Sequence, residues 1–165
     1  MDPRNPYAPP QAVVADAGQG AGEQAPPLWN PNASALWGLV LTPTFSAILH
    51  MKNWQSLGDP ARAASAKHWA IGTVVFTVVS AGLALVLPES PGLDLLFRFS
   101  GLGVLLAWYY GNGKAQVEHV KQRFGDAYPR RSWAVPLSLG FAAVLALLIV
   151  VFVLAFAAAI VDAQS

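Results

Sequence analysis

Two charged side chains, Asp94 and Arg98, interrupt an otherwise apolar stretch of the chain. Their spacing of four residues places both on one face of a helix, where they can pair. Because an ionised group inside a bilayer is costly, such a pair often marks an ion path or a contact with another protein. Arg98 also lies close to the proline-rich turn at 88–92, so its long side chain can extend to the lipid headgroups. We therefore expect a structural Arg98, with gating, ion passage and partner binding as the alternatives.

Catalytic chemistry has little support in the sequence. The chain contains no cysteine, and its histidines lack the paired spacing of metal ligands; they are His50, His68 and His119. All three fall near the ends of apolar segments, where we expect them to face the interface or water. Ser100 and the following glycine are similar to the serine–glycine pair of intramembrane serine proteases, but Arg98 stands where that motif has a glycine, and no deep histidine is present to act as the base. The sequence thus predicts a non-enzyme with no cofactor and no metal.

Small residues recur at intervals of four on two of the apolar segments. One segment carries Gly103, Ala107 and Gly111, and the other carries Thr73 and Thr77. Small side chains let two helix backbones approach each other closely in a bilayer, and threonine hydroxyls can bond across the contact. We expect these faces to pack against each other inside the protein, and contact with another protein is the alternative.

The composition of the chain indicates that these residues belong to a membrane protein. Hydrophobic residues make up 55% of the 165 positions and charged residues only 12%, whereas a soluble domain averages about 45–50% and about 25%. Such a chain lacks the polar surface that a water-soluble domain needs. The net charge of +1 provides no field that would attract nucleic acid. The sequence therefore predicts an integral membrane protein.

Four apolar segments are candidates for spanning helices, at about 31–50, 69–87, 93–110 and 135–160. We predict an all-α fold, a polytopic membrane protein whose residues 29–165 form an antiparallel bundle of four transmembrane helices. Asn30 and Asp59, each followed by proline, are predicted N-caps. Pro43 lies inside the first segment, so we expect a kinked span there, with a re-entrant hairpin as the alternative. Residues 1–28, rich in proline, are predicted to form a disordered tail.

Lysine and arginine are concentrated in the loops 51–68 and 111–134, and they are absent from the turn at 88–92 and from the C-terminus. The positive-inside rule therefore predicts that both loops are cytoplasmic and that the turn and the C-terminus lie outside. A spanning first segment would place the N-terminal tail outside as well, together with Trp29 and Trp37.

The second of these loops contains a predicted amphipathic helix. Val117, Val120 and Phe124 form an apolar stripe, and Gly125 suits the position after the helix end. We expect this helix to lie on the inner leaflet, with docking of a cytoplasmic partner as the alternative.

Three stretches carry a resemblance to other proteins: LWNPN at 28–32, TPTFS at 42–46 and LHMKNWQSLG at 49–58. Together they resemble a pattern in small multi-pass inner-membrane proteins of Gram-negative bacteria, and the opening NPYAPP at 5–10 is similar to the start of several of them. The resemblance implies a location in the bacterial inner membrane and assigns no catalytic activity.

Two classes of function follow. We favour a non-enzymatic inner-membrane protein that acts by protein–protein binding in or at the bilayer, either in protection (immunity) against a membrane-targeting toxin or as a scaffold. Its expected partners are membrane lipids and either another protein or a second copy of itself. The alternative is a small oligomeric transporter or channel, which should place polar groups at the bilayer midplane.

Overall fold

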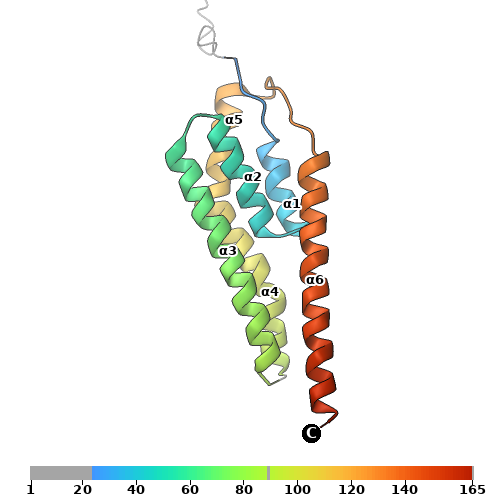
Figure 1. Ribbon diagram of the computed structural model, residues 1–165. Helices are drawn as coiled ribbons and strands as arrows, with labels where there is room; N and C mark the ends of the chain where they lie inside the picture. The colour runs from blue at the N-terminus through green and yellow to red at the C-terminus, as the bar shows by residue number, and fades with distance from the viewer. Residues whose placement is uncertain (1–23, 89, 165) are drawn as a thin grey trace, which may run out of the picture.

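The computed structural model describes residues 24–88 and 90–164, and every regular element in them is a helix. In chain order they are α1 (Pro31–Val40), α2 (Pro43–Ser56), α3 (Pro60–Val86), α4 (Pro91–Trp108), the π-helical turn η1 (Tyr109–Gly113), α5 (Lys114–Phe124) and α6 (Ala134–Asp162) (Figure 1). The all-α prediction is confirmed for this part of the chain. The expected tail lies mainly outside the described residues.

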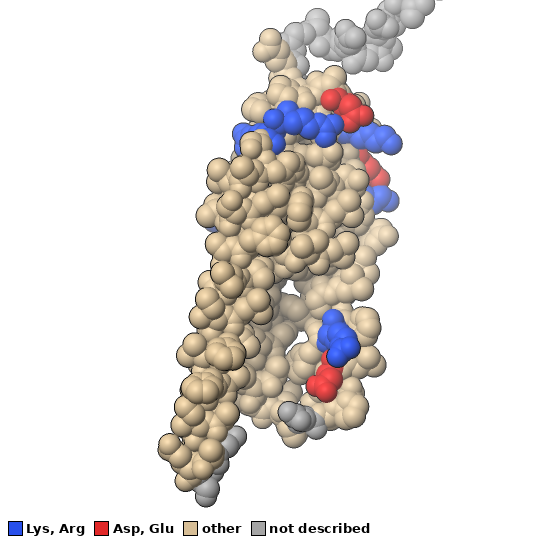
Figure 2. All heavy atoms as spheres, turned by 90° about the vertical axis from the view of Figure 1, so that its right-hand side faces the viewer, with Lys and Arg blue, Asp and Glu red and all other residues tan. Residues whose placement is uncertain are grey.

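Within residues 24–88 and 90–164, three helices are long and apolar enough to cross a membrane. They are α3, the continuous helix from Pro91 to Phe124 that α4, η1 and α5 form together, and α6. We call the end of the molecule with the connections 57–59 and 125–133 the basic end, because the band of charged residues lies there (Figure 2). The opposite end, with the turn between α3 and α4 and the C-terminus, is the far end (Figure 1).

The first apolar segment does not form a fourth long helix. α1 ends at Val40, and α2 begins at Pro43, where the Thr42 hydroxyl caps the new helix by accepting a hydrogen bond from the Phe45 amide at 3.2 Å. With 10 and 14 residues, the helices extend about 15 and about 21 Å, less than the roughly 30 Å of a hydrocarbon core. They form a hairpin in the half of the molecule near the basic end (Figure 1). The expected kinked span over 31–50 is therefore not confirmed, and the alternative of a hairpin has the observed shape.

The hairpin returns the start of the folded chain to the basic end. Leu28 is fully buried, and its backbone exchanges hydrogen bonds with Pro129 and Arg131 at 3.0 and 2.9 Å. Trp37 lies with its ring centroid 6.4 Å from that of Trp133. The expectation that Trp29 and Trp37 lie at the end opposite the basic loops is therefore wrong, and Leu28 belongs to the folded domain rather than to the tail.

Local chemistry fixes the helix ends as the sequence predicts. The Asn30 side chain accepts hydrogen bonds from the first turn of α1, and Asp59 Oδ1 accepts one from the Arg62 amide at 2.9 Å. Gly125, with φ of 57°, follows the last residue of α5. A positive φ is strained for residues with a Cβ, so glycine suits this position.

α5 continues α4 through η1 instead of forming a separate helix along the membrane surface. Val120 is buried against Leu28 and Tyr128, and Phe124 packs on the same cluster. The apolar side of α5 is thus largely covered by the chain itself, so it is not the free amphipathic face that we expected on the inner leaflet.

α6 stands apart from the other helices over most of its length (Figure 1). Near the basic end Pro136 and Gly140 are buried, and a Cβ added at Gly140 would meet Leu41 and Phe45 within 3.0 Å. From Leu145 to Val161 every residue is exposed. α6 therefore packs on the hairpin only through its first part.

Candidate functional site

A cluster of buried polar side chains fastens the hairpin to α5. The Asn53 amide donates to the Trp29 carbonyl oxygen at 2.8 Å and to Gln116 Oε1 at 3.2 Å, and Asn53 Oδ1 accepts from the Trp29 amide at 3.1 Å. Gln116 in turn donates to the carbonyl oxygen of His50 at 2.8 Å. These bonds join residues that are far apart in the sequence, and they satisfy polar groups that would be costly to bury alone.

His50 lies at the centre of this cluster, fully buried, so the expectation of an interfacial histidine is wrong. Its Nε2 lies 3.0 Å from the Pro31 carbonyl oxygen, and its ring meets Trp108 edge-on with centroids 4.9 Å apart. Because a carbonyl oxygen can only accept a hydrogen bond, Nε2 carries a proton and donates it to Pro31. Ser46, one turn earlier, donates to the Ser34 carbonyl oxygen at 2.8 Å. The Ser46 hydroxyl and the His50 ring thus do not form a pair of nucleophile and base.

The other two histidines lie elsewhere. His119, on α5, has its ring centroid 5.1 Å from that of Trp54 and its Nδ1 3.4 Å from Arg62. His68 is exposed on α3. In the described part of the chain no three histidine or acidic side chains come together as metal ligands.

η1 aligns the polar side chains of two helices. Asn112, within it, donates to the Ser65 hydroxyl of α3 at 3.0 Å, and Gln116 follows four residues later on the buried side of α5. Sequence reasoning missed this cluster. The sequence feature that could have revealed the cluster is two pairs of polar residues one turn apart in apolar surroundings, His50 with Asn53 and Asn112 with Gln116.

The charged residues Asp94 and Arg98 are both exposed on α4, and in the described residues no ion pair joins them. Arg98 precedes Leu105 by seven residues, so the two lie on the same helix face. At Leu105 this face is buried against Gly38 of α1, but α1 ends at Val40, and at Arg98 the face is exposed. Figure 2 shows one basic and one acidic side chain apart from the charged band, beside a hollow between two lobes of the far end. We call this hollow the opening.

The expected contact between the small-residue faces is largely not found. Gly103 and Ala107 are exposed, and a Cβ at Gly103 would meet nothing within 4 Å. Gly111 alone approaches α3, where a Cβ would lie 3.0 Å from the Trp69 ring.

The threonines of α3 face α2 rather than α4. The Thr73 hydroxyl, buried, lies 2.8 Å from that of Thr44, and Thr77 bonds within its own helix to the Thr73 carbonyl oxygen at 2.9 Å. Thr73 thus makes a hydroxyl contact between helices, but with α2 and not with the helix that we expected.

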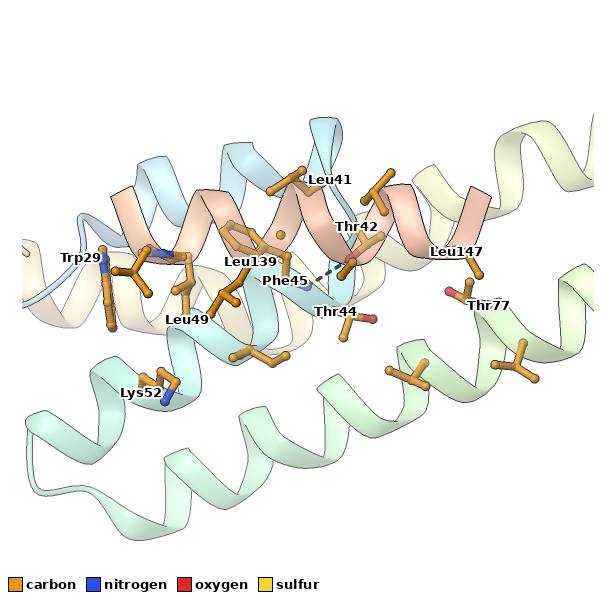
Figure 3. A pocket seen from close by; sticks show the side chains of 18 residues that line it. Trp29, Leu41, Thr42, Thr44, Phe45, Leu49, Lys52, Thr77, Leu139 and Leu147 are labelled. Atoms are coloured by element: carbon orange, nitrogen blue, oxygen red, sulfur yellow. Dashed lines mark hydrogen bonds between the residues drawn. The ribbon is translucent and has the colours of Figure 1, made fainter. Parts of the chain in front are cut away.

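A groove of about 610 Å³ lies between α2, α3 and the first part of α6 (Figure 3). Its walls are almost entirely apolar, with Leu49, Val78 and Leu139 among the lining residues, and Thr42, Thr44 and Thr77 supply hydroxyls. Lys52 is the one charged residue that lines it among the described residues. We call this feature the lateral groove; its size falls in the range of small-molecule sites.

Comparisons of the chain with protein-family models, with curated proteins and with solved structures find no match. The fold defines the class: the described part of the chain is all-helical, with three helices long and apolar enough to span a membrane and a short helical hairpin packed between them at one end.

Proposed function

We propose that this chain is a non-enzymatic membrane protein that acts by binding another protein inside the bilayer, and that the partner occupies the opening. One observation carries the proposal: the face of α4 that packs on α1 at Leu105 is uncovered two turns away, where it bears Asp94 and Arg98. Because the hairpin ends near the middle of the bilayer, it leaves the bundle unfilled beside Asp94 and Arg98.

The chemistry of the opening suits a helix that carries a polar or acidic side chain. An arginine in apolar surroundings is stabilised when it pairs, and a bidentate carboxylate satisfies its guanidinium group best. Arg98 is about 10 Å along the helix from Leu105, at 1.5 Å per residue. A partner helix that enters the opening would cover Arg98, Asp94 and the uncovered side of α6 together.

The resemblance and the distribution of lysine and arginine support a biological setting for this binding. In the bacterial inner membrane, with the basic end in the cytoplasm, the opening would lie in the outer half of the bilayer. A membrane-targeting toxin arrives from that side, so protection (immunity) is one form of the function. Scaffolding of a membrane complex, including one formed by a second copy, is the other.

A photoreactive side chain can test the proposed partner site. Benzoylphenylalanine would replace Gly101, which lies on the Arg98 face and where an added Cβ would meet nothing within 4 Å. In a separate variant it would replace Leu96, which is 61% exposed on the opposite face. After irradiation in the bacterial membrane, we expect a discrete protein adduct from position 101 and none from position 96. Arg98→Ala should remove the adduct without lowering the amount of protein in the membrane, whereas Arg98→Lys should keep part of it.

Three outcomes would overturn the proposal. An adduct from position 96 alone would move the contact to the Gly103 and Ala107 face. An adduct from position 101 that is unchanged in Arg98→Ala would remove the role of the charged residues. Flux of ions or small solutes across liposomes that contain the purified protein alone, altered by Arg98→Ala, would support the transporter or channel instead.

A further inference from the structure

The lateral groove has a positively charged mouth at the basic end. Lys52 and Trp29 both line the groove at this end (Figure 3). One turn further along α2, Ser56 accepts a hydrogen bond from Arg131 at 3.1 Å, and the Arg131 guanidinium lies 4.7 Å from the centroid of the Trp29 ring. The Arg131 guanidinium therefore lies beside the Trp29 ring and bonds to a residue one turn of α2 away from Lys52.

These two cations lack the acidic partners that three of their neighbours have. At the same end Arg62 pairs with Asp59, Lys114 with Glu118 and Arg130 with Asp126, at 3.0–3.6 Å. Neither Lys52 nor Arg131 forms an ion pair with any residue that the structure describes. Lys52 and Arg131 thus contribute two positive charges at this end that no acidic residue in the described part of the chain neutralises.

The depth of the groove matches one leaflet of a bilayer. From Lys52 to Thr42 at the start of α2, ten residues of helix cover about 15 Å, which is half of a roughly 30 Å hydrocarbon core. Over this distance the walls are apolar, with Phe45 and Leu49 on one side and Leu139 on the other. The groove therefore offers an apolar wall below a cationic and aromatic mouth, the order in which a lipid presents its chains and its headgroup.

We propose that the lateral groove binds an anionic glycerophospholipid from the leaflet at the basic end. An acyl chain lies along the groove, and the phosphate lies between Lys52 and Arg131, beside the Trp29 ring. A helix as occupant is disfavoured by size, because a cylinder 10 Å across and 15 Å long occupies about 1,200 Å³, whereas the groove holds about 610 Å³. The bound chain joins α6 to α2 and α3 where the protein's own contacts with α6 are few.

The purified full-length protein can be examined by native mass spectrometry after exchange into micelles that contain either phosphatidylglycerol or phosphatidylcholine. We expect one tightly retained phosphatidylglycerol and no retained phosphatidylcholine. Lys52→Gln should weaken the retention of phosphatidylglycerol about fivefold, the effect of one lysine near an anionic headgroup. Lys67→Gln is the matched control, because Lys67 is exposed at the same end but does not line the groove.

A second pair of variants tests the groove itself. Ala143 lines it and the neighbouring Ala142 does not, although both are exposed. Ala143→Phe should abolish the retained lipid, and Ala142→Phe should leave it unchanged. Equal retention of both lipids, retention unaffected by Lys52→Gln, or a lipid still held by Ala143→Phe would each overturn the proposal. The wild type could instead form an adduct with another protein. If Ala143→Phe removes that adduct and leaves the lipid bound, the occupant of the groove is a helix.

Discussion

His50, Asn53 and Gln116 show how a few buried hydrogen bonds decide the path of this chain. Each of them bonds to a residue at least 19 positions away. A buried polar group without a partner lowers stability by about 1–3 kcal/mol. Breaking one of these bonds therefore destabilises the fold even where the bond itself adds little net energy. Sequence patterns show polar residues in apolar surroundings, but they do not reveal which distant carbonyl will accept the bond. The interior position of His50 was for this reason not predictable.

Removing the Asn53 side chain should therefore destabilise the protein. Asn53→Ala leaves the Trp29 amide and carbonyl and Gln116 Oε1 without their partner, and we expect a loss of about 2 kcal/mol, seen as a lower thermal midpoint in detergent. Asn32→Ala is the control, because Asn32 is exposed on α1 and should change stability by less than about 0.5 kcal/mol. Equal midpoints for the two variants would contradict the role given to the cluster.

At the scale of the elements, the helix ends follow from local sequence, whereas the direction of the chain after Val40 does not. Asn30, Asp59 and Gly125 act within one turn of their own position, and all three were predicted. Pro43 interrupts the helix in either a kinked span or a hairpin, so it cannot distinguish them. The hairpin depends on Gly38, whose missing side chain lets α1 approach both Ser46 of α2 and Leu105 of α4.

A methyl group at position 38 tests this close approach. In Gly38→Ala the new Cβ would lie 2.8 Å from Leu105 Cδ1 and against Ser46 Oγ, so we expect a loss of about 1–3 kcal/mol through overpacking. Gly72→Ala on α3, where nothing lies within 4 Å, should be neutral or stabilising by up to about 1 kcal/mol. Thermal unfolding in detergent compares the two, and a stable Gly38→Ala would show that α1 and α2 are not held together by this contact.

At the scale of the whole molecule, the short hairpin has two consequences. It leaves three long helices instead of the predicted four, so the two ends of the folded domain lie at opposite ends of the molecule (Figure 1). It also leaves the opening beside Arg98 on one side and, with α6, forms the lateral groove on the other. Composition identified the long apolar helices, but it could not show that one 20-residue segment turns back on itself.

The location of the residues before α1 tests this account most directly, and the absence of cysteine makes it simple to measure. Single cysteines would be placed at the exposed positions Gln24, Ala127 and Ala163. Intact spheroplasts would then be treated with a membrane-impermeant maleimide. A hairpin that does not cross the bilayer predicts that Gln24→Cys and Ala127→Cys behave alike and remain unlabelled until the membrane is permeabilised, whereas Ala163→Cys is labelled at once. Labelling of Gln24→Cys together with Ala163→Cys, with Ala127→Cys protected, would mean that the first segment spans the membrane and would contradict the hairpin.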